Sequence, residues 1–487
     1  MKHVISLDLG SSSVRASVVN SDLKIISTWT KALPIERPAP NFVQYNGETI
    51  LCLTESVLNA AINSSNDISA LAITNQRATT AVWHRDTGKT LGPVISWMDL
   101  RTAAICLGLR EKNISIAPNQ SASKLSFLLS LANDENAENY CFGTLDTFLI
   151  WHLTKGQSHL TDHSNAATTG IVQDTTLTWS KEILKTLAIP TQVLPEIAPS
   201  CSYFGDAIIG DKSIPILGAI GDQQASLLGQ GCSKRGQAKI TFGTGTILDQ
   251  NRGFVAPEST RKGKNGTFPI VAYSTNEIIS WATEAIALGS GAMLQWLINS
   301  NILKELVDAN EINSDFRNNS SVYVVPANLG LGTPEWDFGA RSVISGLDLS
   351  TTSIDIVAAT LDGIAQLGSD LLIATEADTN LSISKLHIDG GMTDNSAFLQ
   401  LAADAIGIPL LVASVREATT LGASILAFAQ LESKDYMNFN LGIDLVRYTL
   451  NPRIERDSPI WRTRRERWLE AKHLSLASIP ELTNVVF

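Results

Sequence analysis

Cysteine is scarce in this chain and positive charge is outnumbered, and each shortage argues against a class of protein. The 487 residues include five cysteines, an odd number, and no two of them form a CxxC pair. This pattern gives no sign of a zinc site or a disulfide framework and favours a reducing cytoplasm. The formal net charge is -11 at pH 7. We therefore expect no nucleic acid and no acidic membrane as a partner, because either polyanion would be repelled on average.

Long apolar runs are also lacking. The amino-terminal segment MKHVISLDLG has only a short apolar run before Asp8, which is too short for a signal peptide. We expect no later segment to be long and apolar enough to span a bilayer. Hydrophobic residues nonetheless make up 44% of the chain and charged residues 17%, which is enough for large cores and, at this length, for two or three domains. The sequence predicts a soluble, cytoplasmic, globular protein.

The stretch from Ile214 to Gly245 carries the strongest signals for chemistry. A mostly apolar run, Ile214–Ile220, has the length and branching of a buried strand. Asp222 follows where the strand gives way to a predicted helix, Gln223–Leu228. Asp222 is therefore either the N-cap of that helix or an ionised base, held at the carboxyl end of a strand where open α/β sheets bind their ligands.

Two predicted hairpins have tips suited to binding phosphate. The first joins strands at His3–Leu9 and Val14–Val19 through Gly10 and three serines. The second spans Ala238–Gln250 with Gly243-Thr244-Gly245 at its tip. Glycine lets an anion approach the backbone amides, and the serine hydroxyls add donors. The alternative for the first tip is an ordinary turn.

Two charged residues flank the first tip. Arg15 supplies a fixed positive charge just beyond it. Asp8 lies just before it and is well placed to hold a hydrated magnesium ion, which usually binds one or two carboxylates and keeps several waters.

The segment Leu71–Thr102 predicts a compact β unit with a small polar pocket. Arg77 and Trp97 fall at strand ends, where a guanidinium and an indole could hold a small ligand between them. Core packing is the alternative for Trp97, whereas Arg77 needs a partner if it is buried.

The second half of the chain predicts two helices of different character. In Gly289–Ile298, Gly291 and Gln295 lie four residues apart and share one face. Ser353–Glu376 is a long amphipathic helix with Ser353 as its N-cap.

A βαβ-like unit is predicted at Leu386–Leu411. Ligand atoms would lie over Gly390-Gly391 and the helix start, with Asn395 within reach. The charges of the tail at Pro459–His473 are predicted to form the solvated face of a helix.

Eight segments resemble, in the same order, the motifs of the FGGY carbohydrate kinases, and especially of the glycerol kinases in that family. They run through nearly the whole chain: DLGSSSVR (8–15), ITNQRATTAVWHRDTGKTLGPVISW (73–97), GTLDTFLIWHLT (143–154), GDQQASLLGQG (221–231), FGTGT (242–246), LGLGTPEWDFGAR (329–341), DGGMTDN (389–395) and REATTLGA (416–423). Single motifs of this kind are weak, but eight in one order are specific.

This resemblance implies an α/β protein with two domains of the actin/hexokinase/Hsp70-like (ribonuclease H-like) ATPase fold and an interdomain cleft. Residues 1–249 would form the N-terminal domain, with the substrate pocket and the first phosphate loop. Residues 250–487 would form a nucleotide-binding C-terminal domain with a helical tail. The implied cofactors are ATP and Mg²⁺, the implied partner is a small polyol or sugar, and a homodimer or a homotetramer is a candidate assembly.

The resemblance also implies a role for each matching residue. Asp222 matches the catalytic base, and with Asp8 it would hold the metal. The matching substrate residues are Arg77, Trp97, Asp222 and Gln223, and the matching nucleotide residues are Ser11, Ser12, Ser13, Arg15, Thr244, Gly291, Gln295, Gly391 and Asn395.

Three departures concern the substrate rather than ATP. Ala78 stands where glycerol kinases have Glu, Asn119 where they have Tyr, and Ile247 where they have Phe. A site built to bond a hydroxyl discriminates by about 10⁴-fold or more when the bonding partner is missing, so we expect weak glycerol binding and a longer polyol or sugar as the acceptor. Two alternatives stay open at this point: slow glycerol kinase activity with water in the gap, and an ATP-binding sensor without phosphoryl transfer.

Overall fold

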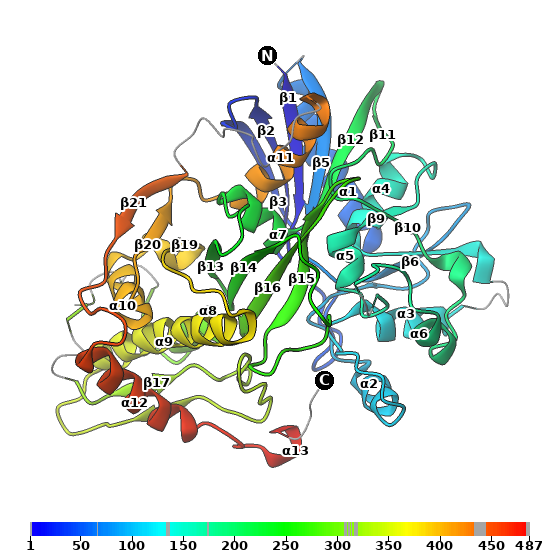
Figure 1. The fold of residues 1–487 in the computed structure, drawn as a ribbon. Helices are drawn as coiled ribbons and strands as arrows, with labels where there is room; N and C mark the ends of the chain where they lie inside the picture. Colours follow the sequence, from blue (N-terminus) through cyan, green and yellow to red (C-terminus); the bar gives the residue numbers. More distant parts are fainter. Residues whose placement is uncertain are drawn as a thin grey trace.

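Two mixed β-sheets form the framework of the computed structural model (Figure 1), which describes residues 2–65, 67–132, 137–172, 175–305, 309, 312, 314–315, 320–432 and 445–483. The six-stranded sheet has the order β11 (Asp206–Ile209), β12 (Lys212–Gly221), β5 (Ile68–Asn75), β1 (His3–Leu9), β2 (Ser13–Asn20), β3 (Ile25–Ala32). The seven-stranded sheet has the order β15 (Phe268–Ser274), β16 (Ile279–Ala287), β14 (Thr246–Gly253), β13 (Ala238–Phe242), β19 (Leu386–Asp389), β20 (Leu410–Ala413), β21 (Val446–Leu450).

Short strand pairs and helices complete the described chain. The pairs are β4 (Gln44–Tyr45) with β7 (Val94–Ile95), β6 (Ala81–His84) with β8 (Tyr140–Gly143), β9 (Leu160–Asp162) with β10 (Glu196–Ala198), and β17 (Tyr323–Val325) with β18 (Val343–Ser345). The helices are α1 (Gly47–Asn63), α2 (Ala103–Arg110), α3 (Ser121–Leu129), α4 (Leu145–Leu153), α5 (His163–Ala167), α6 (Lys181–Thr186), α7 (Asp222–Gly229), α8 (Ser290–Asn299), α9 (Ser353–Thr379), α10 (Ser396–Ile406), α11 (Ala418–Glu432), α12 (Pro459–His473) and α13 (Pro480–Thr483).

The register of the first sheet brings three strand ends together. Strands β1 and β12 both run parallel to β5, and Leu9 and Gly221 both pair with Asn75. Because the carboxyl ends of parallel strands share one edge of a sheet, the residues after β1, β5 and β12 converge there. The last six residues of β5 are all buried, as expected for a central parallel strand covered on both faces.

The second sheet also brings a hairpin tip and the end of a parallel strand together at one edge. Strands β13 and β14 form the predicted hairpin, and β13 runs parallel to β19 so that Thr241 pairs with Asp389. The tip of the hairpin therefore lies beside the end of β19. Strand β14 continues through residues 249 and 250, so we propose a domain boundary ahead of β13 in place of the predicted division.

Helix α11 joins the two halves. It comes from the second half but packs on β1, β5 and β12 of the first sheet and along α7. The two helices approach closely through glycine, since a Cβ at Gly422 would lie 1.8 Å from Ala225 O and one at Gly229 would lie 1.9 Å from Ala418 O. Helix α7 is thereby held against α11, and it contacts strands of both sheets, β5 and β12 of the first and β15 of the second.

Helix α9 corrects two expectations. Its N-cap is Thr352 rather than Ser353, because the Thr352 side chain accepts a hydrogen bond from Asp355 N while Asp355 Oδ2 accepts one from Thr352 N at 2.8 Å. By length and composition α9 could also span a membrane, which contradicts the expectation that no segment could. However, 89% of its apolar window is buried, where it packs on the second sheet.

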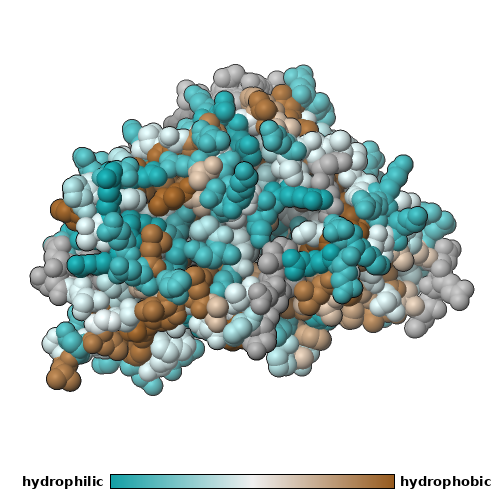
Figure 2. Space-filling view, turned by 60° about the horizontal axis from the view of Figure 1, so that its bottom comes forward, coloured by the Kyte–Doolittle hydropathy of each residue, from teal (hydrophilic) through white to brown (hydrophobic). Residues whose placement is uncertain are grey.

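The predicted solvated helix at the tail exists as α12, but part of its charge is buried. Arg465 and Lys472 are 6% and 5% exposed, and both pair with Asp370 of α9. The remaining surface is mixed. Figure 2 shows a mostly hydrophilic face on which apolar residues gather in separate patches.

Candidate active site

Asp222 is the first residue of α7 and not its cap. The N-cap is Gly221, whose N–H donates to Ser164 Oγ at 2.9 Å and so fixes the junction between β12 and α7. The Asp222 carboxylate accepts a hydrogen bond from its neighbour, Gln223 N, at 2.8 Å, and the side chain is 26% exposed. The N-cap interpretation is therefore wrong, and the carboxylate is open to a ligand.

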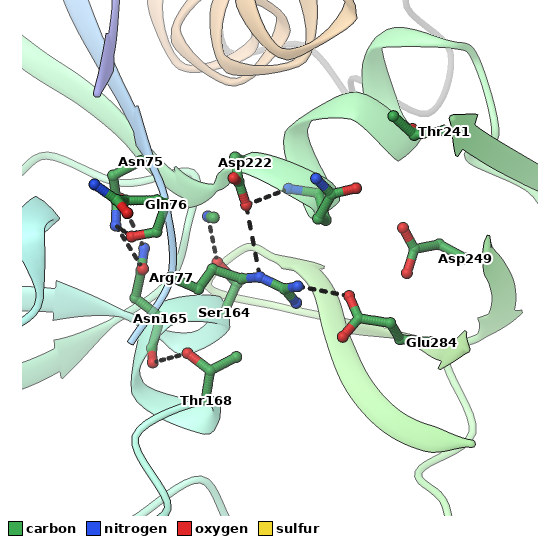
Figure 3. A network of polar contacts seen from close by, with 12 residues as sticks. Asn75, Gln76, Arg77, Ser164, Asn165, Thr168, Asp222, Thr241, Asp249 and Glu284 are labelled. Atoms are coloured by element: carbon green, nitrogen blue, oxygen red, sulfur yellow. Dashed lines mark hydrogen bonds and ion pairs between the residues drawn. The ribbon is translucent and has the colours of Figure 1, made fainter. Parts of the chain in front are cut away.

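Arg77 links Asp222 to the other half of the molecule (Figure 3). Its Nε lies 3.6 Å from Asp222 Oδ1, and its Nη2 lies 2.7 Å from Glu284 Oε2 on β16. Burial raises the pKa of Asp222, although the charge of Arg77 opposes the shift. The guanidinium thus has the partner that its burial requires, and it lies against the Asp222 carboxylate as well as against Glu284.

Gln223 turns toward the second sheet. Its Oε1 accepts from Lys239 Nζ at 2.6 Å. The fully buried ammonium also donates to Thr241 Oγ1 at 3.0 Å and lies 2.9 Å from Asp249 Oδ2. The prediction that Gln223 binds substrate stays a prediction, since its oxygen is held by Lys239.

The backbone of the first predicted phosphate loop is fixed by hydrogen bonds. Gly10 N donates to Ser13 O at 3.0 Å, while Gln76 Nε2 and Tyr45 Oη donate to Gly10 O at 3.1 Å and to Ser11 O at 3.0 Å. The carbonyl oxygens of Gly10, Ser11 and Ser13 are therefore all hydrogen-bonded within the protein. The loop itself is half-buried to exposed, including Ser12, so its amides and hydroxyls are available to an anion.

The charged residues beside this loop meet the start of α11. Arg15 forms an ion pair with Glu417, and its Nη1 lies 4.0 Å from Asp8 Oδ2. Thr419 Oγ1 donates to Asp8 Oδ2 at 3.3 Å. Burial raises the pKa of Asp8 to about 6, with Arg15 opposing the shift and Asp222 adding to it. The charge of Asp222 thus favours the protonated form of Asp8 across the strand ends. Both side chains offer carboxylate oxygens, the ligands that a hard divalent cation prefers.

The second predicted phosphate loop is braced by α8. Gly243 N donates to Gly245 O at 2.9 Å, and Gly291 N donates to Gly243 O at 3.1 Å. A Cβ at Gly291 would lie only 2.5 Å from Gly243 O. Gly291 therefore allows the helix start to touch the loop, while Thr244 at the tip is exposed. Gln295 is exposed one turn along α8 and donates to Asn299 Oδ1 at 3.1 Å.

The predicted adenosine end lies beside this loop. Gly390 has a φ of +99° and its added Cβ would lie 2.3 Å from Phe242 O, whereas nothing lies within 4 Å of a Cβ at Gly391. Asn395 caps α10 by accepting from Phe398 N at 2.8 Å, and its amide donates to Ala309 O at 2.8 Å. Both ends of the Asn395 side chain are thus engaged, so a nucleotide contact from it stays a prediction.

The predicted acceptor side has an aromatic wall and no carboxylate at residue 78. Trp97 is 38% exposed, which argues against the core-packing alternative. Ala78 has a φ of +58°, and its carbonyl accepts from Thr80 Oγ1 at 3.0 Å and Ser121 Oγ at 3.1 Å. Asn119 is exposed and Ile247 is half-buried.

Sequence reasoning missed Ser164, Lys239, Asp249 and Glu284. The last three are charged residues, and two of them, Lys239 and Glu284, fall within largely apolar strands. A charge in such a strand is rarely buried without a partner, and that signal could have found them.

The two sheets, joined at α7 and α11, have the two-domain α/β architecture of the actin/hexokinase/Hsp70-like ATPase fold. Residues 3–229 match the N-terminal domain, and residues 238–431 the C-terminal domain, of the FGGY family of carbohydrate kinases. The chain belongs to this family.

Named relatives agree with this assignment. The chain is 36% identical over 449 residues to a glycerol kinase of Petrotoga mobilis, covering 88% of this chain and 89% of the relative. A glycerol kinase of Escherichia coli strain K12 is 36% identical over 448 residues, with 88% of each chain covered. A crystal structure of Plasmodium falciparum glycerol kinase with ADP has a TM-score of 0.89 at 28% identity, covering 98% of each chain.

A gluconate kinase structure from Lactobacillus acidophilus has a TM-score of 0.84 at 18% identity, covering 99% of each chain, and supports the fold alone. With both domains of the family present, the chain is an ATP-dependent carbohydrate or polyol kinase.

Proposed function

We propose that this kinase transfers the γ-phosphoryl group of ATP to a hydroxyl of a small polyol or sugar longer than glycerol, with Asp222 as the general base. The observation that carries the proposal is the position of Asp222, which starts α7 at the strand edge shared with Asp8 and contacts Arg77. Asp222 would accept the hydroxyl proton while the oxygen bonds to the γ-phosphorus and the bond to the β-phosphate oxygen breaks, releasing ADP. Such a transfer needs positioning more than a strong base.

The raised pKa of Asp222 suits this role. Arg77, placed against the carboxylate, would keep it ionised in spite of burial and orient it toward the acceptor. Trp97 would supply an apolar face for the carbon chain of the acceptor. Without a carboxylate at residue 78, the pocket lacks one of the acceptor groups that glycerol kinases offer to a glycerol hydroxyl, which favours a longer ligand.

The two glycine hairpins would hold the triphosphate. Ser11, Ser12 and Ser13 would bind it from the first sheet and Thr244 from the second, with Arg15 moving from Glu417 to the phosphates. Gly291, which lets α8 brace the second loop, Gln295, Gly391 and Asn395 would line the rest of the nucleotide site.

The carboxylates of Asp8 and Asp222 fit a magnesium ion, because both are oxygen donors at the shared edge where β1 and β12 end, and the charge of Asp222 raises the pKa of Asp8. When bound, the ion would neutralise phosphate charge. Thr419, which donates to Asp8, would orient that carboxylate.

We propose a cytoplasmic kinase with no nucleic-acid or membrane partner, in keeping with its net charge. A homodimer or homotetramer would cover exposed apolar side chains such as Leu347, Leu349 and Ile354, which are 56%, 109% and 64% exposed.

The test is the substitution Asp222→Asn, with ADP release measured under saturating ATP and acceptor. Turnover should fall by a factor on the order of 10² or more if Asp222 is the general base. The matched control is Asp211→Asn, in the exposed turn before the same strand, β12, and it should leave turnover unchanged. Near-normal turnover of Asp222→Asn would remove that residue from the role, and ATP binding without ADP release for any polyol, ketose or sugar acid would overturn the proposed function.

A further inference from the structure

A row of charged side chains crosses the second sheet beside Asp222. Lys239 on β13 pairs with Asp249 on β14, and Asp249 pairs with Glu284 on β16. Directly paired residues of antiparallel strands project from the same face of a sheet. Figure 3 shows the carboxylates of Asp249 and Glu284 on the side where Arg77 and Asp222 lie.

This row is incompletely bonded. Asp249 is 0% exposed, and its Oδ2 has the ion pair with Lys239, but its Oδ1 has no hydrogen-bond partner among the described residues. Arg77 Nη1 is buried and unpartnered in the same way. Buried polar atoms are almost always hydrogen-bonded, so an acceptor atom and a donor atom left open on two facing residues point to a missing ligand.

Lys239, whose buried ammonium needs a counter-ion, accounts for Oδ2 of Asp249 but not for Oδ1. Its ammonium already donates to Gln223 and Thr241, and Asp249 stands directly opposite the like charge of Glu284, a destabilising arrangement in a sheet. Asp249 also lies two residues after Ile247 on the same strand, and therefore on the same face. Ile247 occupies the position where the family resemblance implies a residue of the acceptor pocket.

We propose that Asp249 determines acceptor specificity. This inference rests on the proposed kinase function. Asp249 Oδ1 accepts a hydrogen bond from one hydroxyl of the acceptor and Arg77 Nη1 donates to another, when the Arg77–Glu284 contact between the halves opens. Asp249 thus supplies, from the second sheet, the carboxylate that Ala78 lacks.

The charges of the site define the class of acceptor. Three carboxylates, Asp222, Asp249 and Glu284, face two cations, Arg77 and Lys239. An excess of negative charge disfavours an anionic ligand. The acceptor is therefore a neutral polyol or ketose of four or more carbons, and sugar acids are rejected.

The experiment compares Asp249→Asn and Asp249→Leu with the wild type on glycerol, four- and five-carbon polyols, a five-carbon ketose and an aldonate. For the preferred neutral acceptor, kcat/KM should fall by about 10- to 100-fold, chiefly through KM, because one bond to a charged group is lost. The KM for ATP should not change, and the preference over glycerol should shrink by the same factor. The control is Asp378→Asn, which removes a carboxylate bonded to Asn265 and Thr267 of the same half, and it should leave acceptor preference unchanged.

The outcomes separate the two proposals. A fall in kcat/KM of Asp249→Asn that is equal for every acceptor, including glycerol, would mean that Asp249 serves only as the counter-ion of Lys239. That result would overturn the inference. A wild-type preference for the aldonate would overturn it too. A wild type that phosphorylates none of the compounds would overturn the proposed function instead.

Discussion

Gly291→Ala tests whether the second phosphate loop depends on its contact with α8. The added Cβ would lie 2.5 Å from Gly243 O and 3.2 Å from Thr244 Cα. Ordinary contact begins at 3.4 Å, so the loop tip or the helix start has to shift by about 0.9 Å. The shift also weakens the hydrogen bonds to Gly243 O and Thr244 O, which are 3.1 and 3.3 Å long.

The magnitude follows from that displacement. A reacting group misplaced by about 1 Å can cost on the order of 10²-fold in rate. We therefore expect kcat/KM for ATP to fall between about 10- and 100-fold, with acceptor KM unchanged. The assay is ADP release during an ATP titration at saturating acceptor, together with ATP affinity by calorimetry.

Two other glycines extend the test, Gly108 as a control and Gly391 as a probe of the nucleotide site. A Cβ at Gly108 on α2 would meet nothing within 4 Å, so Gly108→Ala should keep full activity and a similar or higher Tm, since alanine is the better helix former. Gly391 is equally open, and Gly391→Ala should weaken ATP binding only if the adenosine packs there. Wild-type ATP kinetics in Gly291→Ala would refute the reasoning about the loop.

Two further predictions concern the acceptor and the pH dependence of stability. Ala78→Glu should raise kcat/KM for glycerol at least about tenfold, because it restores a hydroxyl-bonding carboxylate; Ala78→Gln should give a smaller gain, and no gain in either would contradict the pocket assignment. Burial lowers the pKa of His159 to about 4, so between about pH 6.5 and 4 the unfolded chain binds the proton more tightly and stability falls as pH falls through that window. His159→Gln, which can still donate to Phe142 O, should lose less Tm between about pH 7 and 5 than the wild type does, and equal losses would show that His159 does not govern the change.

The hairpins and the strand before Asp222 could be predicted because their signals are local. Alternating apolar residues around glycine tips define β1–β2 and β13–β14, and an apolar run ending in glycine defines β12. Those same patterns placed Asp222 at a helix start correctly. They could not show that Gly221 is the cap, since that depends on the bond to Ser164, 57 residues away.

The charged row could not be predicted for a similar reason. Lys239 and Glu284 look anomalous in their own strands, whereas Asp249 stands in a mostly polar one. Only the pairing of β13, β14 and β16 shows that the three residues face one another. The burial of Arg465 in α12 likewise depends on Asp370 of α9, 95 residues away. Whether such a charged residue is buried depends on partners far away in the sequence. The composition of its own helix or strand does not reveal those partners.

The central claim is that one carboxylate, Asp222, receives the acceptor between two phosphate-binding hairpins. The most direct test is a crystal structure with a non-hydrolysable ATP analogue and the preferred acceptor. We predict the phosphates between the Gly10–Ser13 turn and Thr244, with an acceptor hydroxyl within hydrogen-bond distance of Asp222, about 2.6–3.2 Å. An acceptor bound away from Asp222, or phosphates that touch neither hairpin, would contradict the account.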